Sequence, residues 1–194
     1  MAGFPTWSAP QQQDVSEFVQ AIARGLDTCE RAGATRADFY RRFGNRLEDR
    51  IDCTHCNFVR DWKVEDTDTV LLRLKAWFPG CDLREAIKRE YETENLDAQY
   101  RCDRCGQRGS STRSWRFARL APCLLISIDR TQFRAGMQVP KKRVGSVKLP
   151  DMLPLETSHT RVRYGLVAAA CHIGASANAG LWVTWRRGPG LSTV

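Results

Sequence analysis

The chain has 194 residues, which suits one domain or one domain with an appended subdomain. Its residues are 42% hydrophobic and 27% charged, enough for a core, and its net charge of +8 favours acidic partners without indicating a fold. No apolar run approaches the roughly 18–20 residues that span a bilayer, and the N-terminus has no secretory signal. We therefore expect an intracellular protein of the cytoplasm or nucleus, with no membrane partner.

The first predicted element is an amphipathic helix over about residues 15–26. Asp14 can cap this helix, and Glu17, three residues later, completes a capping box. Further along, Phe39 and Phe43 lie in an arginine-rich stretch that can dock on a core. The apolar stripe of the helix comprises Val15, Phe18, Val19, Ile22 and Leu26.

A second helix is predicted directly after Asp82, because Glu85 follows three residues later in another capping box. Its apolar side chains fall on one helical face. They are Leu83, Ala86, Ile87 and Tyr91. Polar, strand-like segments are expected before this helix.

The pattern changes to strands after Leu120. The run Cys123–Ile128 is typical of a buried strand. Residues 164–172 and 181–185 read as two further strands, and the small, polar loop 174–180 between them indicates a hairpin. With helices early and a sheet late, the fold class is α+β.

Two C-x-x-C pairs are the strongest chemical signal in the chain. The pairs are Cys53 with Cys56 and Cys102 with Cys105. Each pair places two sulfurs on one tight turn, so that four thiolates can enclose one structural zinc ion. Four unrelated thiols are the alternative, and a redox function is less favoured because neither pair follows a βαβ pattern. His55, inside the first pair, is expected to be exposed rather than a ligand.

The order of the motifs resembles that of the ubiquitin-specific protease family. The string Gln12–Phe18 opens a helix, the separated cysteine pairs follow, and the run Pro122–Arg130 comes next. Tyr164-x-Leu166 then precedes His172-x-Gly174. The resemblance extends from Gln12 to Trp185, and it accounts for the long gap between the cysteine pairs, which matches the extended fingers of that family.

The resemblance implies a papain-like, hand-shaped fold that is truncated. Residues 14–45 would form a partial helical thumb, residues 46–120 the zinc-bearing fingers, and residues 121–194 the palm β-sheet. The implied partner is ubiquitin or a ubiquitinated protein. Acids at the start of the first helix contact the arginine-rich tail of ubiquitin in this family, which would give Asp14 and Glu17 a binding role in addition to their capping role.

The implied activity is thiol-dependent hydrolysis of the bond after the C-terminal glycine of ubiquitin. The nucleophile of the family lies in a Gly-Asn-Thr-Cys segment upstream of the Gln12–Phe18 string, and residues 1–11 contain no cysteine. The catalytic histidine lies in a Gly-His-Tyr triplet, where this chain has Gly180, Leu181 and Trp182. Leucine cannot accept a proton. His172 matches an earlier histidine of the family, so it is expected to pack or hydrogen-bond rather than to substitute as the base.

Three hypotheses follow from these residues. The chain is a fragment of a cysteine-type deubiquitinase, a non-catalytic ubiquitin-binding module, or a basic zinc module that binds nucleic acid. The last is disfavoured because the basic residues are dispersed, with clusters only at residues 141–143 and 186–187. As an isolated chain, we expect it to be inactive.

Overall fold

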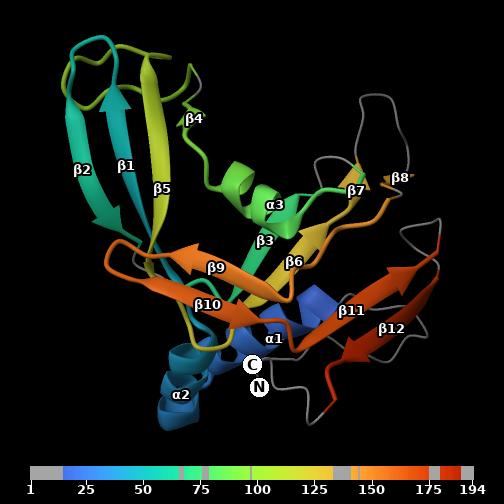
Figure 1. Ribbon diagram of the computed structural model, residues 1–194. Helices are drawn as coiled ribbons and strands as arrows, with labels where there is room; N and C mark the ends of the chain where they lie inside the picture. Colours follow the sequence, from blue (N-terminus) through green and yellow to red (C-terminus); the bar gives the residue numbers. More distant parts are fainter. Residues whose placement is uncertain are drawn as a thin grey trace.

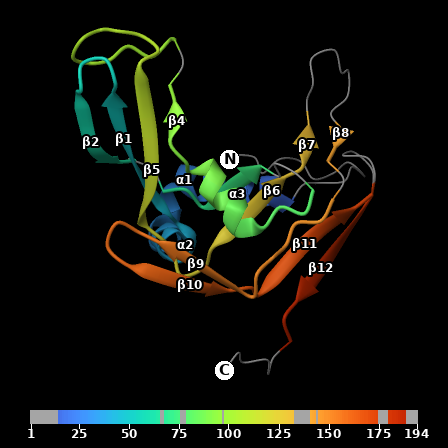
Figure 2. The same ribbon diagram turned by 45° about the horizontal axis from the view of Figure 1, so that its top comes forward.

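The computed structural model describes residues 15–65, 68–75, 79–96, 98–132, 141–143, 145–174 and 180–188. Helices dominate the first part and strands the rest, which confirms the α+β class. A finger-like sheet stands on one side and the β11–β12 hairpin on the other, with α3 between them (Figures 1 and 2). None of the helices in these ranges is both long and apolar enough to cross a membrane.

The sheet that stands apart, here called the finger sheet, has four antiparallel strands in the order β2-β1-β5-β4. β1 is central and pairs with β5 along its whole length, from Arg46 opposite Arg119 to Cys53 opposite Ser111. The strands are β1 (Arg46–Cys53), β2 (Val59–Val64), β4 (Glu94–Asn95) and β5 (Ser111–Arg119).

Ion pairs stabilise the middle of the finger sheet. Glu48 and Asp49 are buried in β1, and as consecutive strand residues they point to opposite faces. Arg116 of β5 donates to Glu48 at 2.5 Å, and Arg60 of β2 donates to Asp49 at 2.5 Å. The Arg116 guanidinium also lies 3.8 Å from the centre of the Trp62 ring. Both faces of the sheet therefore depend on paired charges as well as on apolar contacts.

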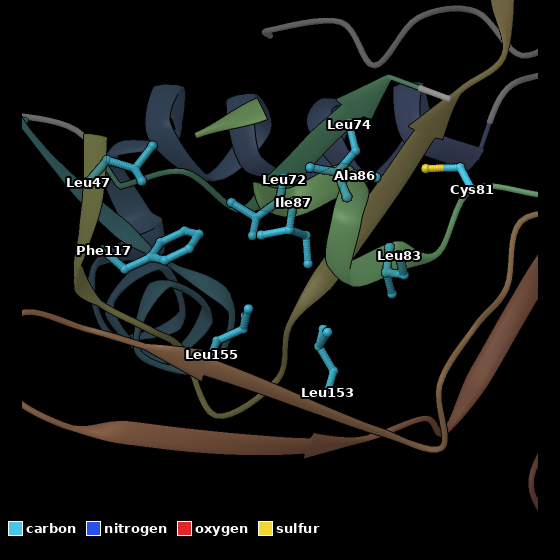
Figure 3. Packing of buried hydrophobic residues seen from close by; sticks show 10 residues of the cluster. All are labelled: Leu47, Leu72, Leu74, Cys81, Leu83, Ala86, Ile87, Phe117, Leu153 and Leu155. Carbon is cyan, nitrogen blue, oxygen red and sulfur yellow. The ribbon is translucent and has the colours of Figure 1, made fainter. Parts of the chain in front are cut away.

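The core lies where the base of the finger sheet meets α3 (Leu83–Glu90) and the parallel pair β3 (Leu71–Lys75) and β6 (Leu125–Asp129). The predicted cap of α3 is confirmed, because the Asp82 side chain accepts a hydrogen bond from the Arg84 amide at 2.8 Å. Figure 3 shows side chains from several elements converging here. The cluster comprises Leu47, Leu72, Leu74, Cys81, Leu83, Ala86, Ile87, Phe117, Leu153 and Leu155.

The first predicted helix is α1 (Val15–Thr28); its proposed cap, Asp14, lies outside the described residues. A short 3₁₀ turn, η1 (Glu30–Ala32), leads to α2 (Gly33–Phe43). The arginine-rich stretch is therefore a helix, which sequence reasoning did not predict. Asp27 joins the helices, because its carboxylate accepts from Arg36 and Tyr40 of α2 at 2.8 Å each.

The remaining strands form small antiparallel pairs. The predicted single strand over residues 164–172 is wrong: its first part belongs to β10, which pairs with β9, and its last part to β11, which pairs with β12. The reason is a change of partner after Gly165. The pairs are β7 (Thr131–Gln132) with β8 (Lys141–Lys142), β9 (Met152–Glu156) with β10 (Arg161–Gly165), and β11 (Ala168–Ile173) with β12 (Leu181–Arg186).

Candidate functional site

The four cysteines of the two C-x-x-C pairs meet at the end of the finger sheet that lies farthest from α2 (Figure 1). Cys53 is the last residue of β1 and Cys56 lies in the turn that leads to β2. Cys102 and Cys105 lie in the turn region before β5. The antiparallel pairing of β1 with β5 therefore brings together two turns that are far apart in the sequence.

The distances between the sulfur atoms fit a tetrahedral zinc ion. All four sulfurs lie within 4.8 Å of one another, with Cys53 and Cys105 at 3.9 Å and Cys56 and Cys102 at 3.7 Å. Zinc–sulfur bonds of about 2.3 Å in a tetrahedron require sulfur–sulfur separations of about 3.8 Å. A disulfide would require about 2.0 Å. The four residues therefore have the geometry of a closed metal site rather than of two disulfides.

The two cysteine turns have the same backbone construction. The residue after the second cysteine has a positive φ in both, 54° at Asn57 and 70° at Gly106. This conformation suits glycine and, next best, asparagine. It lets the chain fold back, so that the Cys53 amide donates to the Phe58 carbonyl at 2.8 Å and the Cys102 amide to the Gln107 carbonyl at 3.0 Å. Asn57 and Gly106 are thus a sequence signal that reasoning from the cysteines alone missed.

Backbone amides and burial act in opposite directions on the thiols of the first turn. Hydrogen bonds from the backbone of Cys56 and then His55 lower the pKa of Cys53 to about 6. Burial raises the pKa of the Cys56 thiol, to about 12, and the neighbouring sulfurs add to this effect. A divalent cation would stabilise the thiolate form of all four sulfurs. His55 is exposed, as predicted, and is not one of the four residues of the cluster.

Leu181, where the resemblance leads us to expect the family histidine, is the first residue of β12 and its side chain is 62% exposed. It pairs with Ile173 of β11. A hydrocarbon side chain at this position offers no atom that can take a proton. The neighbouring Gly180 is sterically required, because a Cβ atom there would lie 2.5 Å from Nε2 of His172.

His172 lies next to this position and is held by a lysine. Lys142 Nζ is 2.9 Å from His172 Nδ1, 2.7 Å from the His172 carbonyl and 2.8 Å from the Gly174 carbonyl. An ammonium group can only donate, so Nδ1 is the acceptor in this contact. The ring also packs against Trp182, with 5.2 Å between ring centroids. These contacts are those of a packed, hydrogen-bonded histidine.

The four cysteines outside the cluster differ in exposure. Cys81 is buried and its thiol donates to the Asp82 carbonyl at 3.4 Å, whereas Cys29, Cys123 and Cys171 are exposed. The prediction that Cys123 opens a buried strand is wrong, because β6 begins at Leu125. Cys171 and His172 are consecutive residues of β11, so their side chains point to opposite faces of the hairpin.

Glu17 lies exposed in the first turn of α1. An acid at a helix N-terminus stabilises the helix through the macrodipole. Its exposure also leaves the carboxylate accessible to a cationic partner. Asp14, the other acid predicted at this helix start, lies outside the described residues.

Comparison with known proteins gives consistent results. The family profile "Ubiquitin carboxyl-terminal hydrolase" matches residues 4–190. Ubiquitin carboxyl-terminal hydrolases 26 and 20 of Arabidopsis thaliana are 27% and 24% identical, over 89% and 94% of this chain. The chain spans only 17% and 27% of the lengths of these two relatives.

Among solved structures, the SAGA DUB module Ubp8/Sgf11/Sus1/Sgf73 bound to monoubiquitin is similar with a TM-score of 0.77 and 20% identity. The match covers 93% of this chain and 42% of that chain. The same module bound to ubiquitin aldehyde matches with a TM-score of 0.74 and 18% identity, covering 93% and 43%. These likenesses show a shared fold. Because the family profile covers nearly the whole sequence, the chain belongs to the ubiquitin carboxyl-terminal hydrolase family.

Proposed function

We propose that this chain binds ubiquitin through the fingers and palm of a ubiquitin-specific protease fold together with the acidic start of α1, and that, on its own, it does not hydrolyse ubiquitin conjugates. The absence of hydrolysis is proposed from Leu181, an exposed hydrocarbon side chain where the resemblance leads us to expect the family histidine. The contact of His172 with Lys142 also supports the absence of hydrolysis, because the Nδ1 atom of the ring already accepts a hydrogen bond from the lysine. The ubiquitin-bound state of the similar SAGA DUB module supports the first part.

In this proposal residues 14–45 form a partial thumb, residues 46–120 the fingers and residues 121–194 the palm. This finger range includes a strand outside the finger sheet, because β3 pairs with β6 rather than with β1, β2, β4 or β5. The fingers hold a structural zinc ion on Cys53, Cys56, Cys102 and Cys105. Four thiolates fill the tetrahedral shell, so that the ion has no open position for substrate and supplies stability rather than catalysis.

Asp14 and Glu17 are the proposed contacts to the basic tail of ubiquitin. The exposure of Glu17 supports this role. The test is a titration of ¹⁵N-labelled ubiquitin with the zinc-loaded chain, followed by NMR. Saturable shifts are expected, and Glu17→Lys should weaken binding because it reverses the charge. Asp38→Lys, at an exposed acid of α2, is the charge-matched control. No shift at high protein concentration would contradict ubiquitin binding.

The catalytic part of the proposal is tested with ubiquitin that carries a fluorogenic amide at its C-terminus. We expect no turnover above that of buffer. The control is pre-treatment of the chain with iodoacetamide, which blocks exposed thiols. Turnover that iodoacetamide abolishes would show that one of the cysteines acts as a nucleophile, and it would overturn the proposal that the chain is inert.

A further inference from the structure

Ser110, which directly precedes β5, connects the two cysteine turns through its backbone. Its carbonyl accepts a hydrogen bond from the Thr54 amide at 2.8 Å and a second from Thr54 Oγ1 at 2.9 Å. Thr54 lies between the two cysteines of the first turn, and Ser110 follows the second turn. The residue therefore occupies a fixed place at the junction of the two turns.

The Ser110 side chain contacts one of the four sulfurs. Its Oγ atom lies 3.8 Å from Cys53 Sγ. A thiolate that binds a metal carries no proton, so the hydroxyl must be the donor in this contact once the site is loaded. Within the described part of the chain, Cys53 is the cluster sulfur for which such a hydroxyl contact is found. The contact makes the four ligands unequal.

We propose that Ser110 is a positioning residue of the metal centre, whose hydroxyl donates a hydrogen bond to the Cys53 thiolate, orients it toward the ion and increases the affinity for zinc. This inference rests on the zinc site proposed above. Groups that hydrogen-bond to metal ligands typically change metal affinity by about 10–100-fold when they are removed. Because the oxygen–sulfur distance is long, we expect the lower end of that range.

The adjacent Ser111 provides a matched control. Its side chain is buried, and its Oγ atom has no hydrogen-bond partner within the described residues. Ser111→Ala removes the same atom type, one residue away, without removing a contact to sulfur. Ser110→Ala keeps the carbonyl that binds Thr54, so it separates the effect of the hydroxyl from that of the backbone junction.

The experiment measures zinc affinity by competition with a chromophoric chelator, and the sulfur-to-cobalt charge-transfer band of the Co²⁺-loaded chain. Ser110→Ala should weaken zinc binding about tenfold. It should also move the band to lower energy, because a thiolate without a hydrogen bond donates charge more readily. Ser111→Ala should leave the zinc affinity and the energy of the band unchanged. Ser110→Thr, which retains a hydroxyl, should keep both close to those of the unmodified chain. A merely structural role would not move the band.

Thr54→Val tests the junction separately. It removes the Oγ1 bond to the Ser110 carbonyl, and it should lower stability without shifting the cobalt band. If the unmodified chain binds zinc but Ser110→Ala and Ser111→Ala behave alike, the role of Ser110 is overturned while the zinc site stands. If the unmodified chain binds no stoichiometric zinc or cobalt, the zinc proposal itself fails.

Discussion

Asn45 joins the finger sheet to the rest of the molecule, and its replacement by alanine should be strongly destabilising. The side chain is fully buried. Its Nδ2 donates to the Thr69 carbonyl at 3.0 Å and to the Phe43 carbonyl at 3.3 Å, and its Oδ1 accepts from the Ala121 amide at 3.0 Å. In the variant the Thr69 carbonyl can still accept the hydrogen bond from the backbone amide of residue 45, which is 2.9 Å long in the unmodified chain. The main loss is therefore the side-chain acceptor of the Ala121 amide.

An orphaned buried donor costs about 1–3 kcal/mol, and the space left by the amide adds to that cost. We therefore expect Asn45→Ala to lower the free energy of unfolding by about 3 kcal/mol, a large share of the roughly 5–15 kcal/mol typical of domains. The assay is urea denaturation of the zinc-loaded chain, followed by tryptophan fluorescence. Asn95→Ala, at an exposed position of β4, is the control. Equal midpoints for the two variants would refute the reasoning.

Three further outcomes are expected. Cys102→Ser should abolish stoichiometric zinc binding, measured by metal analysis after dialysis, and should make stability insensitive to chelators; retained binding would contradict a four-thiolate site. The pKa of every tyrosine is raised, chiefly by burial, and reaches about 12 at Tyr40 and Tyr91. The stability that the neutral tyrosines contribute is therefore complete below the unfolded tyrosine pKa of about 10 and is lost as the pH rises toward the folded pKa of about 12. The absorbance of tyrosinate at 295 nm should thus rise at higher pH in the folded chain than in the denatured chain. Asp82→Ala should cost about 1 kcal/mol, measured by urea denaturation at pH 7, because it removes the cap of α3; an unchanged midpoint would count against that cap.

Local patterns predicted the features that depend on local chemistry. The two cysteine pairs indicated one metal site, and the four sulfurs do lie together. The helices α1 and α3 were predicted because caps and apolar stripes are short-range signals. By contrast, α2 buries no side chain and has no such stripe, so that its sequence resembles a polar loop. It is held by side-chain bonds to Asp27 of α1, which no local pattern reveals.

Features that depend on distant partners were beyond sequence reasoning. The boundary between β10 and β11 exists because the chain changes its pairing partner there. The role of Asn45 needs acceptors and donors at residues 43, 69 and 121, which only the folded chain brings together. The contact of Ser110 with Cys53 likewise needs the register of β1 and β5. In each case the residue types were visible in the sequence, but their neighbours were not.

The β11–β12 hairpin shows why the fold and the proposed chemistry of this chain can separate. Leu181 pairs through its backbone with Ile173 while its side chain is exposed, so the hairpin does not depend on which side chain stands there. Gly180 is different, because any Cβ atom would collide with His172 and with the Ile173 carbonyl. The steric requirement of the hairpin is therefore met at Gly180, while the proposed position of the proton acceptor, residue 181, holds a hydrocarbon side chain. If residue 181 corresponds to the family histidine, as proposed above, leucine there removes the base at little cost to stability, and a fold that binds ubiquitin can then persist without hydrolysing it.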